Sequence, residues 1–234
     1  ELQSGGITNF NLDLMYALPG QDLAGALCDI ERALELGPTH VSHYQLTLEP
    51  DTPFAKRPPP QLPDEDAAWD MQLGCQSRLA AAGYEQYEVS AYARPGRRCR
   101  HNLNYWEYGD YLGIGAGAHG KVTLAATGEI ERTVCARHPA AYLAAHAPHE
   151  RLAEVRRVAA ADLPFEFGLN ALRLVDGFTG QRFEERTGLP RSVLATALDQ
   201  ATARGLLAGH GDLWRPTALG RRFLNDLQAL FLPD

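Results

Sequence analysis

The chain has 234 residues, of which 45% are hydrophobic and 22% are charged, a balance that excludes collagen-like, disordered and disulfide-scaffold proteins. No stretch approaches the roughly 18 apolar residues that a membrane-spanning helix needs. The formal net charge of −7 argues against a general electrostatic affinity for nucleic acid. The cysteines show no CxxC spacing, so we expect free thiols in a cytoplasmic protein; they are Cys28, Cys75, Cys99 and Cys135.

Alternating strand patterns and helical patterns follow one another through the first 92 residues. Strands are expected at residues 9–18, 40–48 and 84–92, with helices at 21–36 and 64–82 between them, and Asp64 as the cap of the second helix. This order predicts an α/β fold with parallel neighbouring strands and helices outside. The polar groups at the carboxyl ends of such strands build the site, which points to Asp13, Thr47 and Ser90. We expect Asp13 on a buried strand, and both Asp13 and Thr47 on inward polar faces.

The second half of the chain has a different pattern. A glycine-rich segment at 113–120 precedes a predicted hairpin over 121–133. Helices are then expected at 165–174, 182–187, 191–204 and 217–230, with a hairpin over 206–216. The first three of these helices and the hairpin outline a winged-helix-like domain. We therefore divide the chain into parts at 1–125, 126–161 (a connecting hairpin and helix) and 162–234.

The glycine-rich segment matches two nucleotide-binding motifs by its letters. Gly115, Gly117 and Gly120 fit a dinucleotide fingerprint, and Gly115 to Lys121 approaches a phosphate loop. The dinucleotide motif must open a helix, whereas residues 121–133 look extended, and the phosphate loop needs Ser or Thr where Val122 stands. The sequence favours a glycine turn that lets the backbone pack closely against a ligand or a neighbouring strand.

The densest group of ligand-capable side chains is HNLNYW at 101–106. An imidazole can bind iron, and aromatic rings can stack on a flat ligand. The alternative is a turn that covers an aromatic packing cluster, and residue chemistry alone favours it.

Three segments together resemble the radical-SAM haem chaperones of the HemW type, which are similar to the oxygen-independent coproporphyrinogen III oxidases. They are DLMYALPGQ at 13–21, HNLNYW at 101–106 and YLGIGAGAHGKV at 111–122. The resemblance implies a partial (β/α) radical-SAM barrel, formed by its C-terminal strands, followed by a C-terminal winged-helix-like α+β domain. It also implies S-adenosylmethionine (SAM) and a [4Fe-4S] cluster as cofactors, and haem as the cargo.

The resemblance also implies roles for individual residues. The positions that match the family's SAM contacts are Asp13, Thr47 and His119. The positions that match the haem-associated HNxxYW motif are His101, Asn102, Tyr105 and Trp106, with His101 as the candidate iron ligand. His119 and then His43 are the competing iron ligands. The family's CxxxCxxC loop has no counterpart among the four cysteines, so we expect the cluster ligands upstream and this chain alone not to hold the cluster.

The implied function is haem binding and transfer to acceptor haemoproteins such as respiratory enzymes, with transient contact with membrane proteins as an option. The enzymatic alternative is oxidative decarboxylation of coproporphyrinogen III. Against it, the oxidases carry Asp-His where this chain has Ser90-Ala91, and they lack HNxxYW. A DNA-binding winged helix is the third class. Residues 162–234 hold eight arginines and no lysine against nine acidic residues, so we expect no nucleic-acid partner.

Overall fold

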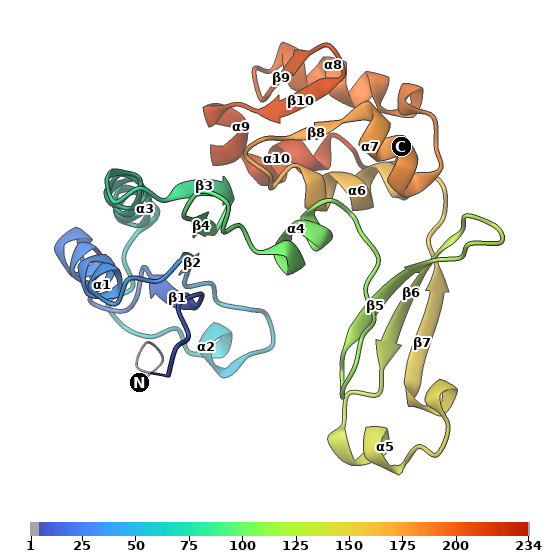
Figure 1. Ribbon diagram of the computed structural model, residues 1–234, viewed down its shortest axis with the longest axis horizontal. Helices are drawn as coiled ribbons and strands as arrows, with labels where there is room; N and C mark the ends of the chain where they lie inside the picture. The colour runs from blue at the N-terminus through green and yellow to red at the C-terminus, as the bar shows by residue number, and fades with distance from the viewer. Residues whose placement is uncertain (1–4, 234) are drawn as a thin grey trace. The chain divides into compact units, whose positions relative to one another are not determined.

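The computed structural model describes residues 5–233, which form two compact units (Figure 1). The N-terminal unit ends at Cys99 and the C-terminal unit begins at Arg100. This division falls earlier in the chain than the predicted boundary at residue 125. The HNLNYW segment and the glycine-rich segment both contact elements that follow them. The Arg173 guanidinium lies 4.3 Å from the centroid of the Trp106 ring, and the Gly117 N–H donates to the Ala136 carbonyl over 2.9 Å.

The N-terminal unit contains a four-stranded sheet with the order β1-β2-β4-β3. β1 and β2 are parallel, with Asn11 opposite His40 and Tyr16 opposite Gln45, which confirms the predicted strand-helix-strand start. The strands are β1 (Asn11–Tyr16), β2 (His40–Gln45), β3 (Glu85–Glu88) and β4 (Ala91–Ala93), and the helices are α1 (Leu23–Glu35), α2 (Pro53–Lys56) and α3 (Glu65–Ala81).

The prediction of one parallel strand over residues 84–92 is wrong. The segment reverses between Glu88 and Ala91, so that β4 runs antiparallel to both β2 and β3. The Glu88 carboxylate accepts a hydrogen bond from the backbone N–H of Ser90, and the Ser90 carbonyl accepts one from His43. No glycine or proline occurs in this turn, and these are the residues that normally reveal a reversal in a sequence.

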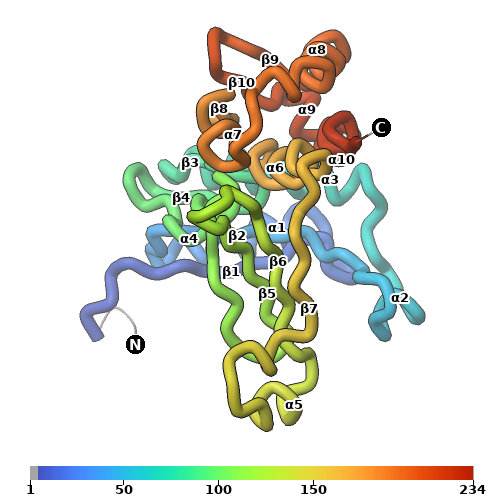
Figure 2. The backbone as a smooth tube through the Cα atoms, turned by 90° about the vertical axis from the view of Figure 1, so that its right-hand side faces the viewer, coloured from blue at the N-terminus to red at the C-terminus, as the bar shows by residue number. Residues whose placement is uncertain are grey.

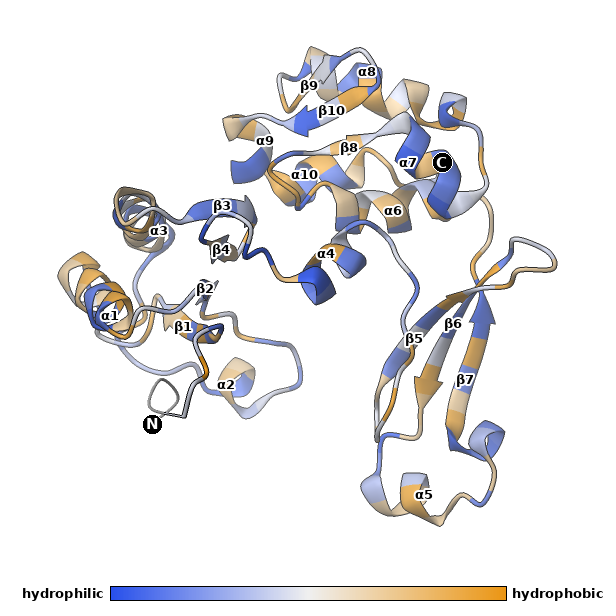
Figure 3. Cartoon of the chain, viewed as in Figure 1, coloured by the Kyte–Doolittle hydropathy of each residue, from blue (hydrophilic) through white to orange (hydrophobic). Residues whose placement is uncertain are grey.

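α1 and α3 pack side by side and supply the core of the N-terminal unit. Each begins at an aspartate: Asp22 accepts from the N–H of Gly25 and Asp64 from that of Ala67, both over 2.8 Å, which confirms the predicted cap at Asp64. Figure 3 shows the apolar residues along α1. The buried side chains of the two helices meet those of the sheet; they are Ala26, Ile30, Met71, Cys75, Leu79, Tyr16, Val41 and Tyr92.

The two faces of β1 and β2 are used differently from the prediction. Asp13 lies on the exposed face of β1 together with Met15, which is 44% exposed, so the expectation of a buried carboxylate is wrong. His43 lies on the buried side with Val41 and stacks on Tyr16 at 4.5 Å between ring centroids. Alternation alone indicates two faces, but it does not say which of them the helices cover.

The C-terminal unit begins with α4 (Arg100–Trp106) and an antiparallel sheet, β5 (His119–Thr123), β6 (Ile130–Cys135) and β7 (Leu152–Arg157), whose strands lie side by side in Figures 1 and 2. The hairpin predicted over 121–133 is confirmed by the β5–β6 pairing, and β7 was not predicted. Between β6 and β7 lie α5 (Pro139–Ala144) and the 3₁₀ turn η1 (Pro148–Arg151).

The rest of the C-terminal unit packs around Phe167, whose ring centroid lies 5.2 Å from those of Phe178 and Phe183. The hairpin predicted over 206–216 is confirmed, while the helix predicted over 217–230 is interrupted at Phe223. The elements are α6 (Leu163–Ala171), β8 (Phe178–Thr179), α7 (Gly180–Thr187), η2 (Arg191–Leu194), α8 (Ala195–Ala203), β9 (Leu207–His210), β10 (Leu213–Pro216), α9 (Ala218–Arg222) and α10 (Leu224–Ala229), and β8, β10 and β9 form a sheet in that order. Among the helices of residues 5–233, none is long and apolar enough to cross a membrane.

The buried His43 predicts a loss of stability in acid. Burial lowers the pKa of its imidazole from 6.5 to about 4, with Asp29 opposing the shift. The folded state disfavours the charged imidazole, so His43 costs no stability above pH 6.5, where it is neutral in both states. As the pH falls from 6.5 towards 4, the unfolded state takes up the proton first, and the free energy of unfolding falls by about 3 kcal/mol in all. We expect His43→Phe to show a smaller loss of unfolding free energy between pH 7 and pH 4 in urea denaturation.

The control for this prediction is His210→Gln, which changes an exposed histidine on β9. It should lose stability in acid as the unmodified protein does. A His43→Phe variant that loses stability over the same pH range as steeply as the unmodified protein would contradict the assignment.

Candidate functional site

The HNLNYW segment lies in a helix, α4, and not in the turn that the packing alternative assumed. The helix ends in a Schellman motif: the N–H of Gly109 donates to the Asn104 carbonyl over 2.7 Å, and that of Tyr108 donates to Tyr105 over 2.9 Å. Tyr108 occupies the left-handed position of this motif with φ 56°, where glycine is usual. Because a tyrosine stands where a glycine usually marks the end of a helix, the sequence pattern does not reveal this helix end.

One side of α4 carries His101 and Tyr105. These residues are four positions apart and therefore adjacent on the helix, with ring centroids 4.8 Å apart in an edge-on arrangement. His101 is exposed, and the Tyr105 ring lies 4.3 Å from that of Tyr111. An exposed imidazole supported by two aromatic rings is a suitable donor for a flat iron-containing ligand.

Trp106 belongs to the interior of the C-terminal unit. The Arg173 guanidinium lies 4.3 Å from its ring centroid, and the indole lines a cavity of about 170 Å³ with Phe167 and Phe178. Its Nε1 atom is buried without a hydrogen-bond partner among the described residues. Asn102 is partly buried on the same helix. For Trp106, the structure therefore supports the packing interpretation of the motif.

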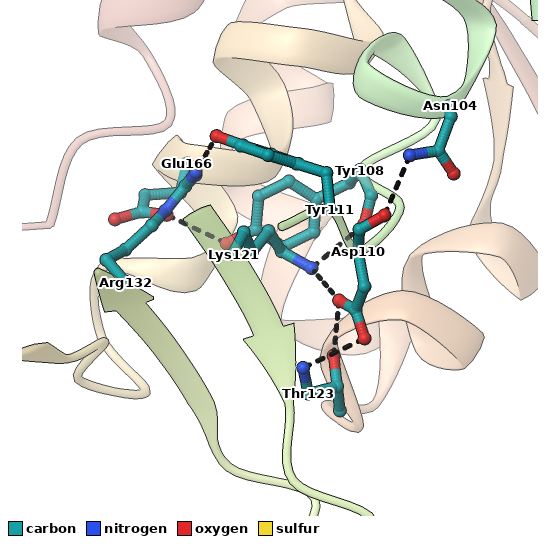
Figure 4. Close-up of polar contacts among 8 residues, drawn as sticks. All are labelled: Asn104, Tyr108, Asp110, Tyr111, Lys121, Thr123, Arg132 and Glu166. Atoms are coloured by element: carbon teal, nitrogen blue, oxygen red, sulfur yellow. Dashed lines mark hydrogen bonds and ion pairs between the residues drawn. The ribbon is translucent and has the colours of Figure 1, made fainter. Parts of the chain in front are cut away.

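Lys121 anchors the segment that follows α4. This residue is 1% exposed, and its Nζ lies 2.8 Å from Asp110 Oδ1, 3.1 Å from the Tyr108 carbonyl oxygen and 4.2 Å from the centroid of the Tyr108 ring (Figure 4). Burial lowers the pKa of Lys121, and the bond to Asp110 opposes that shift. Asp110 also accepts the backbone N–H and the hydroxyl of Thr123, both over 2.9 Å. The carboxylate thereby joins the segment after α4 to β5.

Glu166 of α6 joins the sheet to the helical core. Its Oε2 accepts from the Tyr108 hydroxyl and from Arg132 over 2.8 Å each, and its Oε1 accepts from Arg156 over 3.1 Å. Burial alone would raise the pKa of Glu166, but the hydrogen bonds from Arg132 and Tyr108 outweigh it and lower the pKa. Arg132 also donates to the Tyr111 hydroxyl over 2.9 Å. These contacts connect α6 and β6 to Tyr108 and Tyr111, which follow α4 in the chain, as Figure 4 shows.

The glycine-rich segment packs against its own neighbours. A Cβ on Gly113 would lie 2.5 Å from the His119 carbonyl oxygen, and one on Gly120 would lie 2.5 Å from the Thr133 hydroxyl. The segment leads into β5 and not into a helix, which supports the close-packing interpretation over a dinucleotide motif. His119 is the exposed first residue of β5, opposite Val134.

The remaining predicted SAM residues, Asp13 and Thr47, lie in the N-terminal unit, whereas His119 lies in the C-terminal unit. Asp13 accepts a hydrogen bond from the Asn11 amide over 2.8 Å. Thr47 is exposed beyond the end of β2, so the expectation of an inward strand position is wrong for Thr47. Asn11 in turn lies 2.7 Å from the His40 ring, whose other nitrogen lies 2.8 Å from the hydroxyl of Tyr87 on β3.

Sequence reasoning missed this chain of polar contacts. Asn11 and His40 face one another across two parallel strands, and only the register of the strands reveals that pairing. Ser42, which also donates to Asn11 over 3.2 Å, was available as a signal because it follows His40 on the same face of β2.

The residues present do not fit a [4Fe-4S] cluster. All four cysteines are free thiols, and residues 5–233 contain no group of three His, Cys, Asp or Glu side chains that could hold a metal ion. His43, a competing iron ligand in the sequence analysis, is 5% exposed beneath α1 and α3, so it is not accessible to a large ligand.

Comparisons with known proteins agree with the resemblance seen in the three sequence segments. Residues 158–223 match the HemN C-terminal domain family. The chain is 48% identical to "Heme chaperone HemW" of Haemophilus influenzae over 98% of its length, and 49% identical to that of Escherichia coli over 100%. It spans 58% and 61% of the length of those two curated relatives.

A solved structure also matches. It is described as "Coproporphyrinogen III oxidase (HemN) from Escherichia coli is a Radical SAM enzyme", and it matches 98% of this chain and 56% of its own with a TM-score of 0.75 at 19% identity. This match shows a shared mixed α/β fold. The two curated relatives confirm the resemblance to the haem chaperones.

The hydrogen bonds of Glu166 predict a stability effect. Glu166→Gln keeps the shape of the side chain but removes the charge that faces Arg132 and Arg156. We expect the free energy of unfolding at pH 7 to fall by about 2 kcal/mol, as is typical for hydrogen bonds to charged groups. Glu154→Gln, an exposed position on β7, is the matched control in urea denaturation. Equal stability of the two variants would show that the Glu166 network contributes little.

Proposed function

Because this chain resembles the HemW haem chaperones along its whole length, we propose that it takes part in binding haem and passing it to acceptor haemoproteins such as respiratory enzymes. The observation that carries the proposal is the pair His101 and Tyr105 on the exposed side of α4. An imidazole is one of the commonest axial donors to haem iron, and an adjacent aromatic ring adds contact area for the porphyrin.

The residues of the HNxxYW motif have different roles in this proposal. His101 is the iron ligand and Tyr105 contacts the porphyrin, because both lie on the side of α4 where His101 is exposed. Trp106 holds the helix against the C-terminal unit through its packing with Arg173 and Phe167. Asn102, on the same helix, is the remaining member of the haem-associated set.

The N-terminal unit is proposed as part of a partial radical-SAM barrel, with residues 162–234 as a winged-helix-like domain. The parallel β1–β2 pair, with α1 and α3 packed on the sheet, supports the barrel, and α6, α7 and α8 with the β9–β10 hairpin support the second domain. The division into 1–125, 126–161 and 162–234 remains a proposal; it differs from the two compact units, which divide after Cys99.

SAM is the proposed ligand of Asp13 and Thr47 in the N-terminal unit. His119 of the C-terminal unit is proposed separately as a SAM contact. The exposed Asp13 carboxylate can accept hydrogen bonds from the hydroxyl or amino groups of a nucleoside ligand. Its bond from Asn11 fixes its orientation on β1. SAM bound at a [4Fe-4S] cluster supplies radical chemistry, and no ligand set for such a cluster is found among the described residues.

Decarboxylation of coproporphyrinogen III remains the alternative activity, because the oxidase HemN shares this fold. The identity to the haem chaperones, 48–49% against 19% for HemN, supports haem transfer as the preferred proposal. Formation of the product porphyrinogen in an assay of the full-length protein would select the oxidase.

The haem proposal predicts a spectroscopic change. Ferric haem added to the protein should develop an absorption band distinct from that of free haem, and His101→Ala should remove or shift that band because the axial ligand is lost. Tyr105→Ala should weaken haem affinity with less spectral change. His210→Ala, at an exposed position outside α4, is the control and should leave the band in place.

The same titration tests the competing ligand. A band altered by His119→Ala and unaffected by His101→Ala would move the iron ligand to the start of β5. If neither variant changes haem uptake, the haem assignment of the HNLNYW helix is wrong.

The SAM proposal predicts a loss of affinity. In the full-length protein, Asp13→Ala should weaken SAM binding, measured by calorimetry, while the visible absorbance of the cluster stays intact. Asp51→Ala, which changes an exposed aspartate in the loop before α2, is the control. Unchanged SAM affinity in the Asp13 variant would contradict the assignment.

A further inference from the structure

We infer that Lys121 is the positioning residue of the haem-binding helix: it holds the carboxyl end of α4, and so sets the orientation of His101 and Tyr105. The inference rests on the proposed function for its consequence in haem binding. The positioning itself stands on the contacts of Lys121 within the C-terminal unit.

The burial of Lys121 requires that its partners be fixed. An ammonium group removed from water must be paired and hydrogen-bonded, and Lys121 meets that requirement with two oxygens and an aromatic face. Its carboxylate partner, Asp110, is held by Thr123 of the same strand. The Lys121 ammonium group is therefore fixed in position, and it bonds to Tyr108 and Asp110 in the segment before β5.

One of those oxygens is the carbonyl of Tyr108, the left-handed residue that ends α4. A residue with a Cβ is strained at this position, and surrounding contacts must maintain it. Lys121 binds the Tyr108 carbonyl, and Glu166 binds its hydroxyl over 2.8 Å. If these contacts are lost, the Schellman motif has less to oppose the strain, and α4 can unwind from its carboxyl end.

A second connection runs through the backbone of Lys121. Its N–H donates to the Tyr111 carbonyl over 2.9 Å, and its carbonyl accepts from the Tyr111 N–H over 2.8 Å. The Tyr111 ring lies 4.3 Å from that of Tyr105, which in turn lies 4.8 Å from the ring of His101. Lys121 is thus connected to His101 in two ways: through Tyr108 at the end of α4, and through the adjacent rings of Tyr111 and Tyr105.

The test compares Lys121→Met with the unmodified protein. Methionine retains much of the length and apolar volume of the side chain but has no ammonium group. Lys56→Met, at the other lysine of the sequence, which is exposed on α2, is the matched control. Amide hydrogen exchange of a peptide covering residues 100–110 reports on α4, and a ferric-haem titration below the unfolding temperature reports on the site.

We expect faster exchange across residues 100–110 in Lys121→Met, with the β6–β7 pair unchanged. Haem affinity should fall about tenfold or more, the range found when groups that orient a metal ligand are removed, and the absorption band should move towards that of His101→Ala. Unchanged exchange across residues 100–110 would overturn the inference. In a protein whose haem band is removed by His101→Ala, faster exchange of Lys121→Met with an unchanged haem band and affinity would overturn it as well, because the lysine would then support only the fold.

Two further variants keep the test decisive if Lys121→Met does not fold. Asp110→Asn retains an acceptor for the lysine and should produce the same changes at smaller amplitude. The double variant Lys121→Met with Asp110→Asn leaves no carboxylate that has lost its cation. Asp110→Asn alone supplies the baseline for the altered contacts with Thr123, so a haem defect beyond that baseline arises from the lost contacts of Lys121 with Tyr108.

The outcomes also separate this inference from the proposed function. If His101→Ala does not change the haem spectrum while Lys121→Met accelerates exchange in α4, the haem function fails and the positioning of the helix stands. If His101→Ala removes the band while Lys121→Met changes neither exchange nor haem binding, the function stands and the inference fails.

Discussion

The C-terminal unit depends on a buried positive charge whose partners must be close and fixed. Lys121 meets this constraint with the carbonyl of Tyr108 and the carboxylate of Asp110, and the same tyrosine reaches Glu166 through its hydroxyl. Glu166 in turn binds Arg132 on β6. A single set of charge-assisted contacts therefore joins the end of α4, two strands and α6. Hydrogen bonds to charged groups are stronger than neutral ones, so this set contributes to holding the four elements together.

The residues of α4, the helix that carries the HNLNYW segment, differ in their surroundings. His101 is exposed, whereas Trp106 packs against Arg173 and the aromatic core. Binding and packing were alternatives for the segment as a whole; the structure supports packing for Trp106, and haem binding is proposed for the exposed His101. This division has a physical basis, since a ligand-binding side chain must be accessible while the helix that presents it needs a buried anchor to keep its orientation. Tyr105 lies between the two and contacts Tyr111 beneath it.

The sheet of the N-terminal unit has a comparable division. α1 and α3 bury one face with Tyr16 and Val41, and the other face carries linked polar groups from Asp13 through Asn11 to His40. Hydrogen bonds on this face satisfy groups that would otherwise be costly to desolvate, and burial lowers the pKa of His40 so that its neutral form is favoured. Such a surface is suited to a polar ligand, in keeping with the SAM site proposed there.

The sequence by itself determined most of the elements and the family resemblance. Alternation located β1, β2 and the β5–β6 hairpin, and an aspartate marked the start of α3, because strand periodicity and helix capping are local properties. Only the tertiary structure decided which face of β1 is exposed, where residues 84–92 reverse, and that the HNLNYW segment is helical. These features depend on partners distant in sequence. Asp13 is exposed because the helices cover the opposite face, and α4 ends at Tyr108 because Lys121 and Glu166 hold a residue whose identity alone would not predict a helix end.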